Sequence, residues 1–315
     1  MMHIAFITPE YPHSLTNSSG GLGTSIKNLA HSLIYQRVEV SIFIYAQDQN
    51  KTFKEDKINF YLIKQKSYKF GGFYLYRKYL QQYINLKIKE ESIDLLEAPD
   101  WTGITAFMTF KCPLVIRLNG SDGYFCHLEN REQKPKNRFF EKRALQAANA
   151  IVSVSAFTGE VTSEIFKLDN KISVIPNSLD PNNFMPSTLK VDENLLLYFG
   201  TIIRKKGVLE LASIFNKVIQ EKPNAKLLLL GKDVVDVFEN KSTLELFITS
   251  LSKEAKSMVE HLQEVSYSDV KNYIASAKVI LLPSFAEALP MTWLEAMSME
   301  RALVTSNVGW APEVM

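Results

Sequence analysis

Cysteine is scarce in this sequence, which has only Cys112 and Cys126 among its 315 residues. Two cysteines supply neither a disulfide framework nor the ligand set of a structural zinc site. Long apolar runs are also lacking, since none approaches the roughly 18 residues of a membrane span. The start Met-Met-His-Ile-Ala-Phe has no cationic leader of the kind found in signal peptides. We therefore expect a cytoplasmic protein, with any membrane contact peripheral and on the inner face.

An excess of one charge is missing too, because 36 Lys and Arg residues offset 34 Asp and Glu residues and leave a formal net charge of +2. This balance argues against nucleic acid as a partner. Hydrophobic residues make up 46% of the chain and charged residues 22%, as in ordinary globular proteins, and the length suffices for two cores. No Asp-x-Asp pair occurs, so no such carboxylate pair is present to hold a metal ion beside phosphates.

Short β-branched or aromatic runs alternate with helical patterns along the chain, as a parallel sheet with crossover helices requires. The predicted strands are residues 3–8, 38–45, 58–63, 95–98, 114–118, 150–154 and 172–176, then 195–199, 226–230, 279–282 and 302–305. We predict an α/β protein with two facing Rossmann-like doubly wound parallel-sheet domains, residues 1–180 and 194–315, joined by a turn-rich linker at 181–193. In such sheets ligands bind at the carboxyl ends of the strands.

The most informative stretch is the run of residues 284–295, which follows a predicted buried strand. A helix can begin at Pro290, because the first helical residues do not need their N–H groups. Amides from Leu289 to Met291, with the positive end of the helix dipole, would seat a phosphate. Glu287 and Glu295 flank that seat, and each carboxylate can accept two hydroxyl hydrogen bonds, which suits a sugar and a ribose. The alternative is an ordinary strand–helix turn with a glutamate near the helix start.

Three cations crowd a second loop, Arg204-Lys205-Lys206, which lies before a helix predicted over 208–220. Clustered cations need an anion. Lys206 is the strongest candidate for a diphosphate ligand, followed by Arg204. The alternative is a loop whose cations are simply solvated.

A glycine-rich loop occupies residues 20–23. A nicotinamide-binding fingerprint would place its glycines directly after the first strand, whereas this loop lies about a dozen residues beyond it, and Ile26 stands where the third glycine belongs. We expect instead that Gly21 and Gly23 let the backbone approach a ligand closely. The alternative is a flexible surface loop, capped by a hydroxyl side chain at the helix start.

Together these residues resemble glycosyltransferase family 4, retaining enzymes of GT-B fold. That family binds its donor with a glycine and a Lys-Gly loop and with two glutamates eight positions apart, matched here by Gly200, Lys206-Gly207, Glu287 and Glu295. Further matches, in the same order as in the family, are the glycine-rich loop, residues 175–180 at the domain junction and residues 306–309.

The resemblance implies a metal-independent hexosyltransferase without a cofactor. It would move a hexose or N-acetylhexosamine from a UDP- or GDP-linked sugar to a saccharide or lipid-linked acceptor, in surface polysaccharide or glycoconjugate synthesis. The catalytic residues would be Glu287, Lys206 and Asn119. The donor-binding residues would be Gly21, Gly23, Thr201, Arg204, Lys206, Gly231, Leu289, Pro290, Met291 and Glu295.

Candidate acceptor-binding residues follow two predicted strands of the first domain, because strand carboxyl ends favour function. These residues are Glu97, Asp100, Trp101, Arg117 and Ser121. Trp101 could stack on a sugar face. An arginine just inside a strand end, such as Arg117, is as often the partner of an internal salt bridge.

The chain departs from the family pattern at two residues and at its end. Thr201 stands where an arginine usually touches the donor phosphate, and Asn119 stands where many members have a histidine. The sequence also stops at Met315, before the strand and helices that close the second domain in the family, so we expect that domain to be incomplete. The alternative function is therefore a degenerate sugar-nucleotide-binding protein without turnover.

The segment 51–89 is locally basic and aromatic. Its cations and rings include Lys64, Lys66, Lys69, Arg77 and Lys78 with Phe70, Phe73, Tyr74 and Tyr76. Such a segment can rest on an anionic membrane surface. The alternative is the solvated face of a helix predicted over 72–90.

Overall fold

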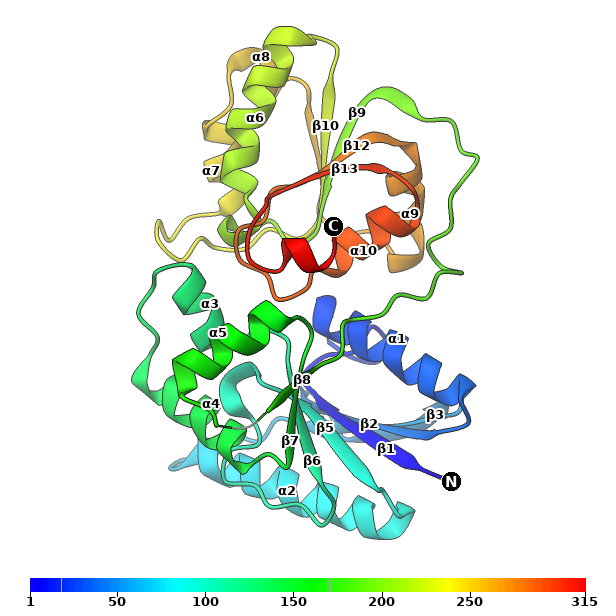
Figure 1. Cartoon of the computed structure of the whole chain (residues 1–315), viewed down its shortest axis with the longest axis vertical. Helices are drawn as coiled ribbons and strands as arrows, with labels where there is room; N and C mark the ends of the chain where they lie inside the picture. Colours follow the sequence, from blue (N-terminus) through cyan, green and yellow to red (C-terminus); the bar gives the residue numbers. More distant parts are fainter. Residues whose placement is uncertain (18, 170) are drawn as a thin grey trace. The chain divides into compact units, whose positions relative to one another are not determined.

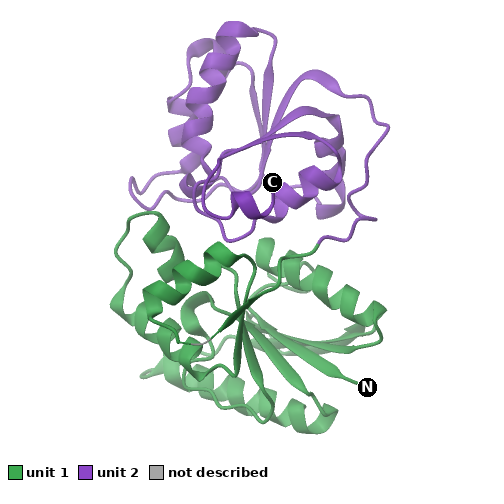
Figure 2. Cartoon of the chain, in the orientation of Figure 1, with its two compact units in different colours: residues 1–178 green, residues 179–315 purple. Residues whose placement is uncertain are grey.

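A computed structural model describes residues 1–17, 19–169 and 171–315, which form two compact units, Met1–Ser178 and Leu179–Met315 (Figure 1, Figure 2). The predicted linker at 181–193 lies in the second unit, and its last two residues already belong to the first strand of that unit.

The first unit is built on a sheet with strand order β3-β4-β2-β1-β5-β6-β7-β8. Its strands are β1 (His3–Thr8), β2 (Glu39–Gln47), β3 (Lys51–Glu55), β4 (Ile58–Lys64), β5 (Leu95–Pro99), β6 (Leu114–Leu118), β7 (Ala150–Ser153) and β8 (Ile172–Val174). Its helices are α1 (Gly21–Tyr35), α2 (Gly72–Glu91), α3 (Asp122–Leu128), α4 (Pro135–Ala147) and α5 (Ala156–Phe166), with the short 3-10 helix η1 (Trp101–Gly103).

Two apolar cores lie on opposite faces of this sheet, because successive residues of a strand point to opposite sides. Ala5 and Ile7 of β1 belong to the core that α2 covers with Leu80 and Ile84. Phe6, between them, belongs to the core that α1 covers. The central strands β1 and β2 are buried on both faces, which explains why they read as nearly continuous apolar runs.

The edge strand β3 departs from the predicted all-parallel arrangement, since it pairs antiparallel with β4. The sequence gives little sign of it because four of its five residues are exposed and polar. Phe53 alone turns inward, where its ring stacks on Phe60 with 4.8 Å between centroids. Charged residues on an exposed edge are the usual protection against unwanted strand pairing.

The second unit has a parallel sheet of order β11-β10-β9-β12-β13. Its strands are β9 (Asp192–Phe199), β10 (Lys226–Leu230), β11 (Val259–Leu262), β12 (Ala277–Leu282) and β13 (Ala302–Thr305). Its helices are α6 (Val208–Glu221), α7 (Thr243–Thr249), α8 (Lys253–Lys256), α9 (Tyr267–Ser276) and α10 (Met291–Ser298), with the 3-10 helices η2 (Arg204–Lys206) and η3 (Ala311–Glu313). The predicted class, α/β with two parallel-sheet domains, is confirmed.

Among the described residues, no helix combines the length and the apolar character needed to cross a bilayer.

Candidate functional site

Three ionisable side chains of the second unit meet where β9 and β12 end. Lys206 comes from η2, Glu287 from the loop after β12, and Glu295 from α10. The Lys206 Nζ lies 3.1 Å from Glu287 Oε1, and its charge also lowers the pKa of Glu295 against the effect of burial. Lys206 Nζ lies close to Gly200 as well, since a Cβ there would come within 3.4 Å of it. The structure thus brings together the two loops that the sequence singled out.

Backbone contacts fix these two loops against each other. The carbonyl of Lys205 accepts hydrogen bonds from the amides of Phe285 (3.0 Å) and Ala286 (3.2 Å). Gly207, at φ +72°, packs directly on the carbonyl of Pro283, and any side chain at this position would collide with it. The glycine is therefore needed both for its left-handed backbone and for this close approach.

Glu295 is nearly enclosed, with 3% of its surface exposed. The hydroxyl of Tyr267, the first residue of α9, donates a hydrogen bond to Glu295 Oε1 at 2.7 Å. Burial raises the pKa of Glu295 to about 7, in spite of this bond and of the nearby Lys206. Nothing in the sequence marked Tyr267, because a tyrosine in the first turn of a helix has no pattern that distinguishes it.

Helix α10 begins at Met291, one residue after Pro290, and no side chain caps its first turn. Leu289 and Met291 are both buried. The first amides of a helix have no partner within the helix and carry the positive end of its dipole, so this end can receive an anion. The predicted phosphate seat at 289–291 has the required helix start, and its occupancy stays a prediction.

Arg204, predicted as a second donor ligand, is paired with a carboxylate of its own chain. Its guanidinium donates to Asp236 through Nε at 2.6 Å and Nη2 at 3.0 Å. The side chain of Asp236 is fully buried, and its hydrogen bond to Arg204 lowers its pKa. The pair gives Arg204 a structural role, since it ties η2 to the loop after β10, and a contact of Arg204 with the donor phosphate stays a prediction.

Two further predicted donor residues, Thr201 and Gly231, lie at the ends of β9 and β10. The Thr201 carbonyl accepts a hydrogen bond from the Tyr198 hydroxyl at 2.7 Å, and its side chain is exposed. Gly231, at φ +150°, faces the carbonyl of Gly200 so closely that a Cβ would collide with it. Gly231 is thus required by the packing of neighbouring strand ends, whatever ligand lies above them.

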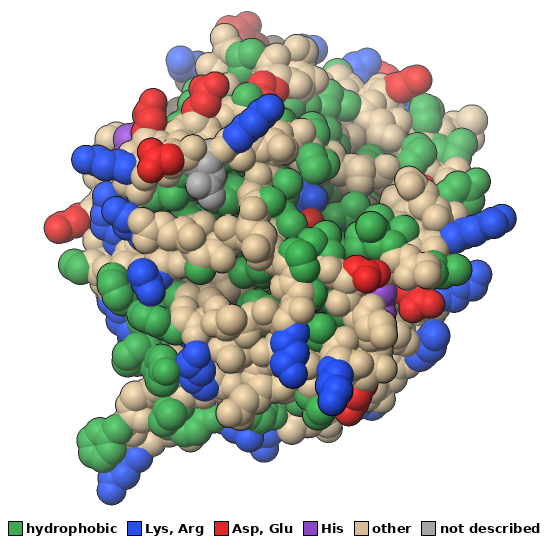
Figure 3. Space-filling view, turned by 60° about the horizontal axis from the view of Figure 1, so that its bottom comes forward, with side chains coloured by type: hydrophobic (Ala, Val, Ile, Leu, Met, Phe, Trp, Pro, Cys, Tyr) green, Lys and Arg blue, Asp and Glu red, His purple; other side chains and the backbone are tan. Residues whose placement is uncertain are grey.

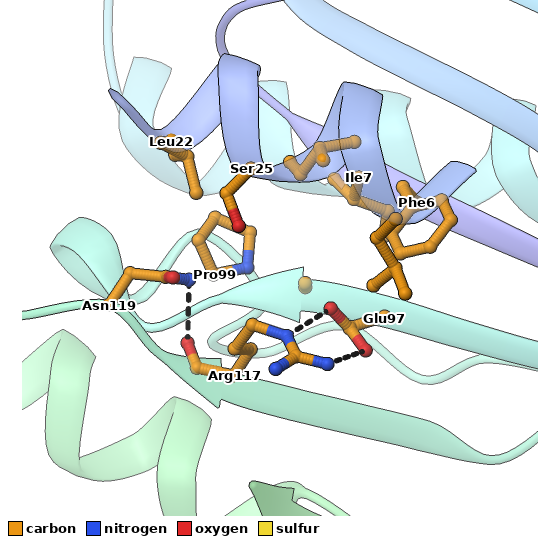
Figure 4. A pocket seen from close by; sticks show the side chains of 11 residues that line it. Phe6, Ile7, Leu22, Ser25, Glu97, Pro99, Arg117 and Asn119 are labelled. Carbon is orange, nitrogen blue, oxygen red and sulfur yellow. Dashed lines mark hydrogen bonds and ion pairs between the residues drawn. The ribbon is translucent and has the colours of Figure 1, made fainter. Parts of the chain in front are cut away.

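In the first unit, Glu97 of β5 and Arg117 of β6 form an ion pair. Arg117 donates to the two carboxylate oxygens of Glu97 at 2.7 and 3.2 Å (Figure 4). It also donates to the carbonyl of Ile175 at 3.0 Å. Both side chains are largely buried. They line a cavity of ≈ 10 Å³, room for about one water molecule. The structure thus shows the internal salt bridge, and the cavity is too small for a sugar.

The other predicted acceptor residues differ in accessibility. Asp100 is buried, and its Oδ1 accepts a hydrogen bond from the amide of Asn119 at 3.1 Å. Ser121 is buried as well, and its hydroxyl caps α3 by accepting from the amide of Tyr124 at 3.2 Å. Trp101, by contrast, is 42% exposed at the carboxyl end of β5. The stacking role of Trp101 stays a prediction, whereas the side chains of Asp100 and Ser121 are engaged with backbone amides.

Burial, with a smaller contribution from the nearby charge of Glu141, raises the pKa of Asp100 to about 7 against the effect of the hydrogen bond from the Asn119 amide. Glu141 accepts from the amides of Asp122 and Gly123 at 3.0 Å each, at the start of α3. Its own pKa is raised by burial against the effect of these bonds. Two acidic side chains thus lie buried behind the strand ends of the first unit.

The glycine-rich loop forms the start of α1, and Glu10 caps it. The Oε1 of Glu10 accepts from the amides of Gly20 at 2.9 Å and Gly23 at 2.8 Å. A Cβ on Gly23 would lie 3.1 Å from Tyr11 Cα, so the glycine permits a close backbone approach. At Gly23 the close approach is to the chain itself, whereas the space around Gly21 is open and a ligand there stays a prediction. Sequence analysis overlooked Glu10, although it stands just beyond the carboxyl end of β1.

The described residues contain no group of three or more His, Cys, Asp or Glu side chains placed to hold a metal ion.

Two family models match the chain. The profile described as Glycosyltransferase Family 4 matches residues 19–183, and the one described as Glycosyl transferases group 1 matches residues 180–315. The chain belongs to glycosyltransferase family 4. This glycosyltransferase is 24% identical over 336 residues to an uncharacterised glycosyltransferase of Methanocaldococcus jannaschii, covering 100% of this chain and 83% of the relative. It is 27% identical over 189 residues to the alpha-maltose-1-phosphate synthase of Mycobacterium tuberculosis, covering 56% of this chain and 48% of that protein.

Solved structures agree on the fold of the glycosyltransferase. Sucrose-phosphate synthase from Thermosynechococcus elongatus matches with a TM-score of 0.77 at 17% identity, over 98% of this chain and 82% of the other. Anabaena HepE in complex with UDP-glucose matches with a TM-score of 0.69 at 17% identity, over 100% of this chain and 83% of the other. The two parallel-sheet units have the GT-B fold of these neighbours.

Proposed function

We propose that this glycosyltransferase is a retaining, metal-independent enzyme. It would move a hexose or N-acetylhexosamine from a UDP- or GDP-linked sugar to a saccharide or lipid-linked acceptor, in the cytoplasm, during surface polysaccharide or glycoconjugate synthesis. The observation that carries the proposal is the cluster of Lys206, Glu287 and Glu295 beside the start of α10. One cation, a helix N-terminus and two carboxylates supply partners for a diphosphate and for two sets of sugar hydroxyls.

In this proposal Lys206 and the first amides of α10 bind the diphosphate, Glu295 accepts the ribose hydroxyls, and Glu287 accepts hydroxyls of the transferred sugar. Family membership and the eight-residue spacing of the two glutamates support this division. It requires the ribose to share Glu295 with Tyr267, and the sugar to share Glu287 with Lys206.

The transfer itself needs little acid–base chemistry from the protein. The bond between the anomeric carbon and the phosphate oxygen breaks, and the acceptor oxygen bonds to the same face of that carbon. The acceptor proton passes to the departing phosphate. Lys206 and the α10 amides would stabilise the negative charge that develops on that phosphate, and they need no metal ion to do so.

The pairing of Arg204 with Asp236 favours a second candidate, a sugar-nucleotide-binding protein without turnover. Thr201 already lacks the usual cation, and Arg204 is engaged elsewhere, so Lys206 is left with a larger share of the phosphate charge. Asn119 also favours the second candidate. It stands where many family members have a histidine, and its amide can form hydrogen bonds but cannot act as an imidazole does.

A panel of UDP- and GDP-linked sugars tests both candidates. Calorimetry measures binding of each donor, and release of the nucleoside diphosphate in the presence of saccharide acceptors measures transfer. We expect one donor class to bind and to be turned over. Binding without release would favour the non-catalytic protein, and absence of binding to every donor would contradict both.

A further inference from the structure

Exposed aromatic side chains gather on one face of the first unit, around the start of α2 and along α4. The exposed fractions are 79% for Phe70, 48% for Phe73, 42% for Tyr74, 42% for Leu75 and 53% for Phe139. Single exposed apolar residues are ordinary on protein surfaces, whereas several large ones together mark an interaction site.

The rings form a connected group. Phe107 lies 6.0 Å from Tyr74 and 5.9 Å from Phe139, measured between ring centroids. Phe140 lies 5.3 Å from Phe73 and 5.7 Å from Phe139. This chain of contacts joins the first turn of α2 to α4, so the rings of Phe73, Tyr74 and Phe139 belong to one surface, and Phe70 precedes that turn in the chain.

The surroundings of these rings are cationic. No Asp or Glu occurs between residues 57 and 89, and the single acid of α4, Glu141, is buried. Exposed cations occur in both segments that carry the rings: Lys66 and Lys69 precede α2, and Lys134, Lys136 and Arg143 lie at the start of α4 or within it. Lys136 Nζ lies 4.9 Å from the Phe73 ring centroid, and the Arg143 guanidinium 5.6 Å from that of Phe107. Figure 3 shows hydrophobic and cationic side chains side by side at the lower left of this view.

Phe70 is held outward by the turn that starts α2. Gly71 adopts φ +63°, and its carbonyl accepts from the amides of Tyr74 at 2.9 Å and Leu75 at 3.0 Å. The left-handed residue and these two bonds fix the turn. The Phe70 ring is therefore exposed to solvent at a fixed position. Its transfer from water to an apolar environment would lower the free energy.

We propose that the surface formed by these aromatic residues and cations, the docking patch, binds an anionic lipid bilayer. Phenylalanine rings have no hydrogen-bonding groups and lower their free energy by entering the acyl boundary, while long cationic side chains reach the headgroups around them. Lysine and arginine clusters with interspersed apolar side chains are suited to this surface. The absence of acids from residues 57–89 removes the repulsion that would oppose it.

The docking patch adjoins the strand end that carries Trp101. Arg77, in the second turn of α2, donates to the carbonyl of Gly103 at 3.2 Å and lies 4.5 Å above the ring of Phe140. A bilayer bound at the patch would bring a lipid-linked acceptor near this end of the first unit. That consequence rests on the proposed function, whereas bilayer binding does not.

Vesicle sedimentation tests the proposal on the whole chain. The wild type should bind vesicles of equal parts phosphatidylglycerol and phosphatidylcholine, and bind pure phosphatidylcholine far more weakly. Each cation near an anionic surface contributes about fivefold in affinity, from ~1 kcal/mol. The variant Lys66→Gln/Lys69→Gln/Lys136→Gln should therefore bind about a hundredfold more weakly. The matched control changes three exposed lysines of the second unit, Lys217→Gln/Lys222→Gln/Lys253→Gln, and should bind like the wild type.

A second pair of variants tests the aromatic part. Phe70→Ser should weaken vesicle binding about tenfold, whereas Tyr35→Ser, at a side chain that is 90% exposed on α1, should leave it unchanged. Equal loss in both lysine variants would show unspecific attraction and overturn the proposal. Absence of wild-type binding at low salt would overturn it too, as would displacement of the vesicles by single-stranded RNA. None of these measurements requires transfer activity, so they stand apart from the test of the proposed function.

Discussion

At the scale of single residues, Lys206 is held by a carboxylate that a bound donor would have to share. Its Nζ lies 3.1 Å from Glu287 Oε1. The pair keeps the ammonium in place before a ligand arrives, and it adds a negative charge that the diphosphate must overcome. Glu287 thus orients Lys206 before the donor binds, but its negative charge reduces the attraction of the site for the diphosphate. Substitution of Lys206 measures how much attraction is left.

We expect Lys206→Ala to weaken binding of the nucleoside diphosphate by about 1.5 to 3 kcal/mol, the scale of a hydrogen bond to a charged group. Isothermal calorimetry with UDP and GDP measures this. Lys205→Ala is the matched control, because it removes a neighbouring cation of the same loop and keeps the Lys206 ammonium that lies beside Glu287, so it should cost little. Equal affinity for Lys206→Ala and wild type would end the assignment.

The two glutamates should respond differently to the same change. Glu295→Gln should weaken the free nucleoside diphosphate, because one ribose partner loses its charge. Glu287→Gln should leave that affinity nearly unchanged and lower the rate of transfer. Calorimetry and product release measure the two effects. Equal effects of both variants on nucleotide affinity would refute the division of roles.

Asp100 should make stability depend on pH. Burial first and the charge of Glu141 second raise its pKa to about 7, above the ordinary value of about 4 in an unfolded chain. The folded protein therefore binds the extra proton between these values. Its free energy of unfolding should fall as pH rises through this window, by at most about 1.4 kcal/mol per pH unit for this group.

Urea unfolding at about pH 5 and about pH 7 should show a smaller decline for Asp100→Asn than for the wild type. Asp48→Asn, at an exposed position, serves as control and should decline like the wild type. A decline of the same size in Asp100→Asn would show that Asp100 keeps its charge when folded.

At the scale of elements, features that depend on local sequence could be predicted, whereas features that depend on long-range contacts could not. Strands with both faces buried, such as β1 and β6, were predicted to the residue because apolar residues dominate them. The strands β3 and β11 were not predicted. Both lie at sheet edges and contain polar residues, so neither has the apolar run by which the other strands were recognised. The two site loops could be predicted because their glycines and glutamates are close together in the sequence. The partners Glu10, Asp236 and Tyr267 did not, because each meets its contact only after the chain has folded back.

The Arg204–Asp236 pair belongs to this scale, because it joins η2 to the loop after β10. Arg204→Ala would leave a buried carboxylate unpaired and should lower the free energy of unfolding by about 3 kcal/mol. Adding Asp236→Asn should recover part of that loss. Nucleoside diphosphate affinity, measured on the folded protein, should stay unchanged in Arg204→Ala.

A fall in affinity as large as that of Lys206→Ala would contradict the structural role of Arg204. Thr201→Arg gives the complementary measurement. It adds a cation at the end of β9 and should tighten nucleotide binding at low salt more than at high salt.

At the scale of the whole molecule, both units are built from the same scheme of strand, loop and helix, and chemistry-bearing residues follow the carboxyl ends of the strands in both. This regularity is why the fold class could be predicted from alternation alone. The site could be predicted only in part. The positions of Glu287 and Glu295 followed from spacing, whereas the burial of Asp100 and Ser121 depends on how α3 and α4 cover them.

Turnover should survive a chelator, because Lys206 and the α10 amides supply the positive charge that a metal ion would otherwise provide. Product release is measured with and without EDTA, using the donor that binds most tightly. Loss of activity that Mg²⁺ or Mn²⁺ restores would show that the reaction depends on a divalent ion.

The hydroxyl of Tyr267 already gives Glu295 a hydrogen bond of the kind that a ribose would give. An active site usually discriminates against an analogue lacking a hydroxyl because its own buried group is left unsatisfied. In the role proposed for Glu295, Tyr267 would continue to satisfy one oxygen of that carboxylate when a ribose hydroxyl is missing. The penalty for a 2′-deoxynucleotide is therefore reduced, and the protein's preference for ribonucleotides over deoxyribonucleotides should be shallower than a carboxylate without such a neighbour would give.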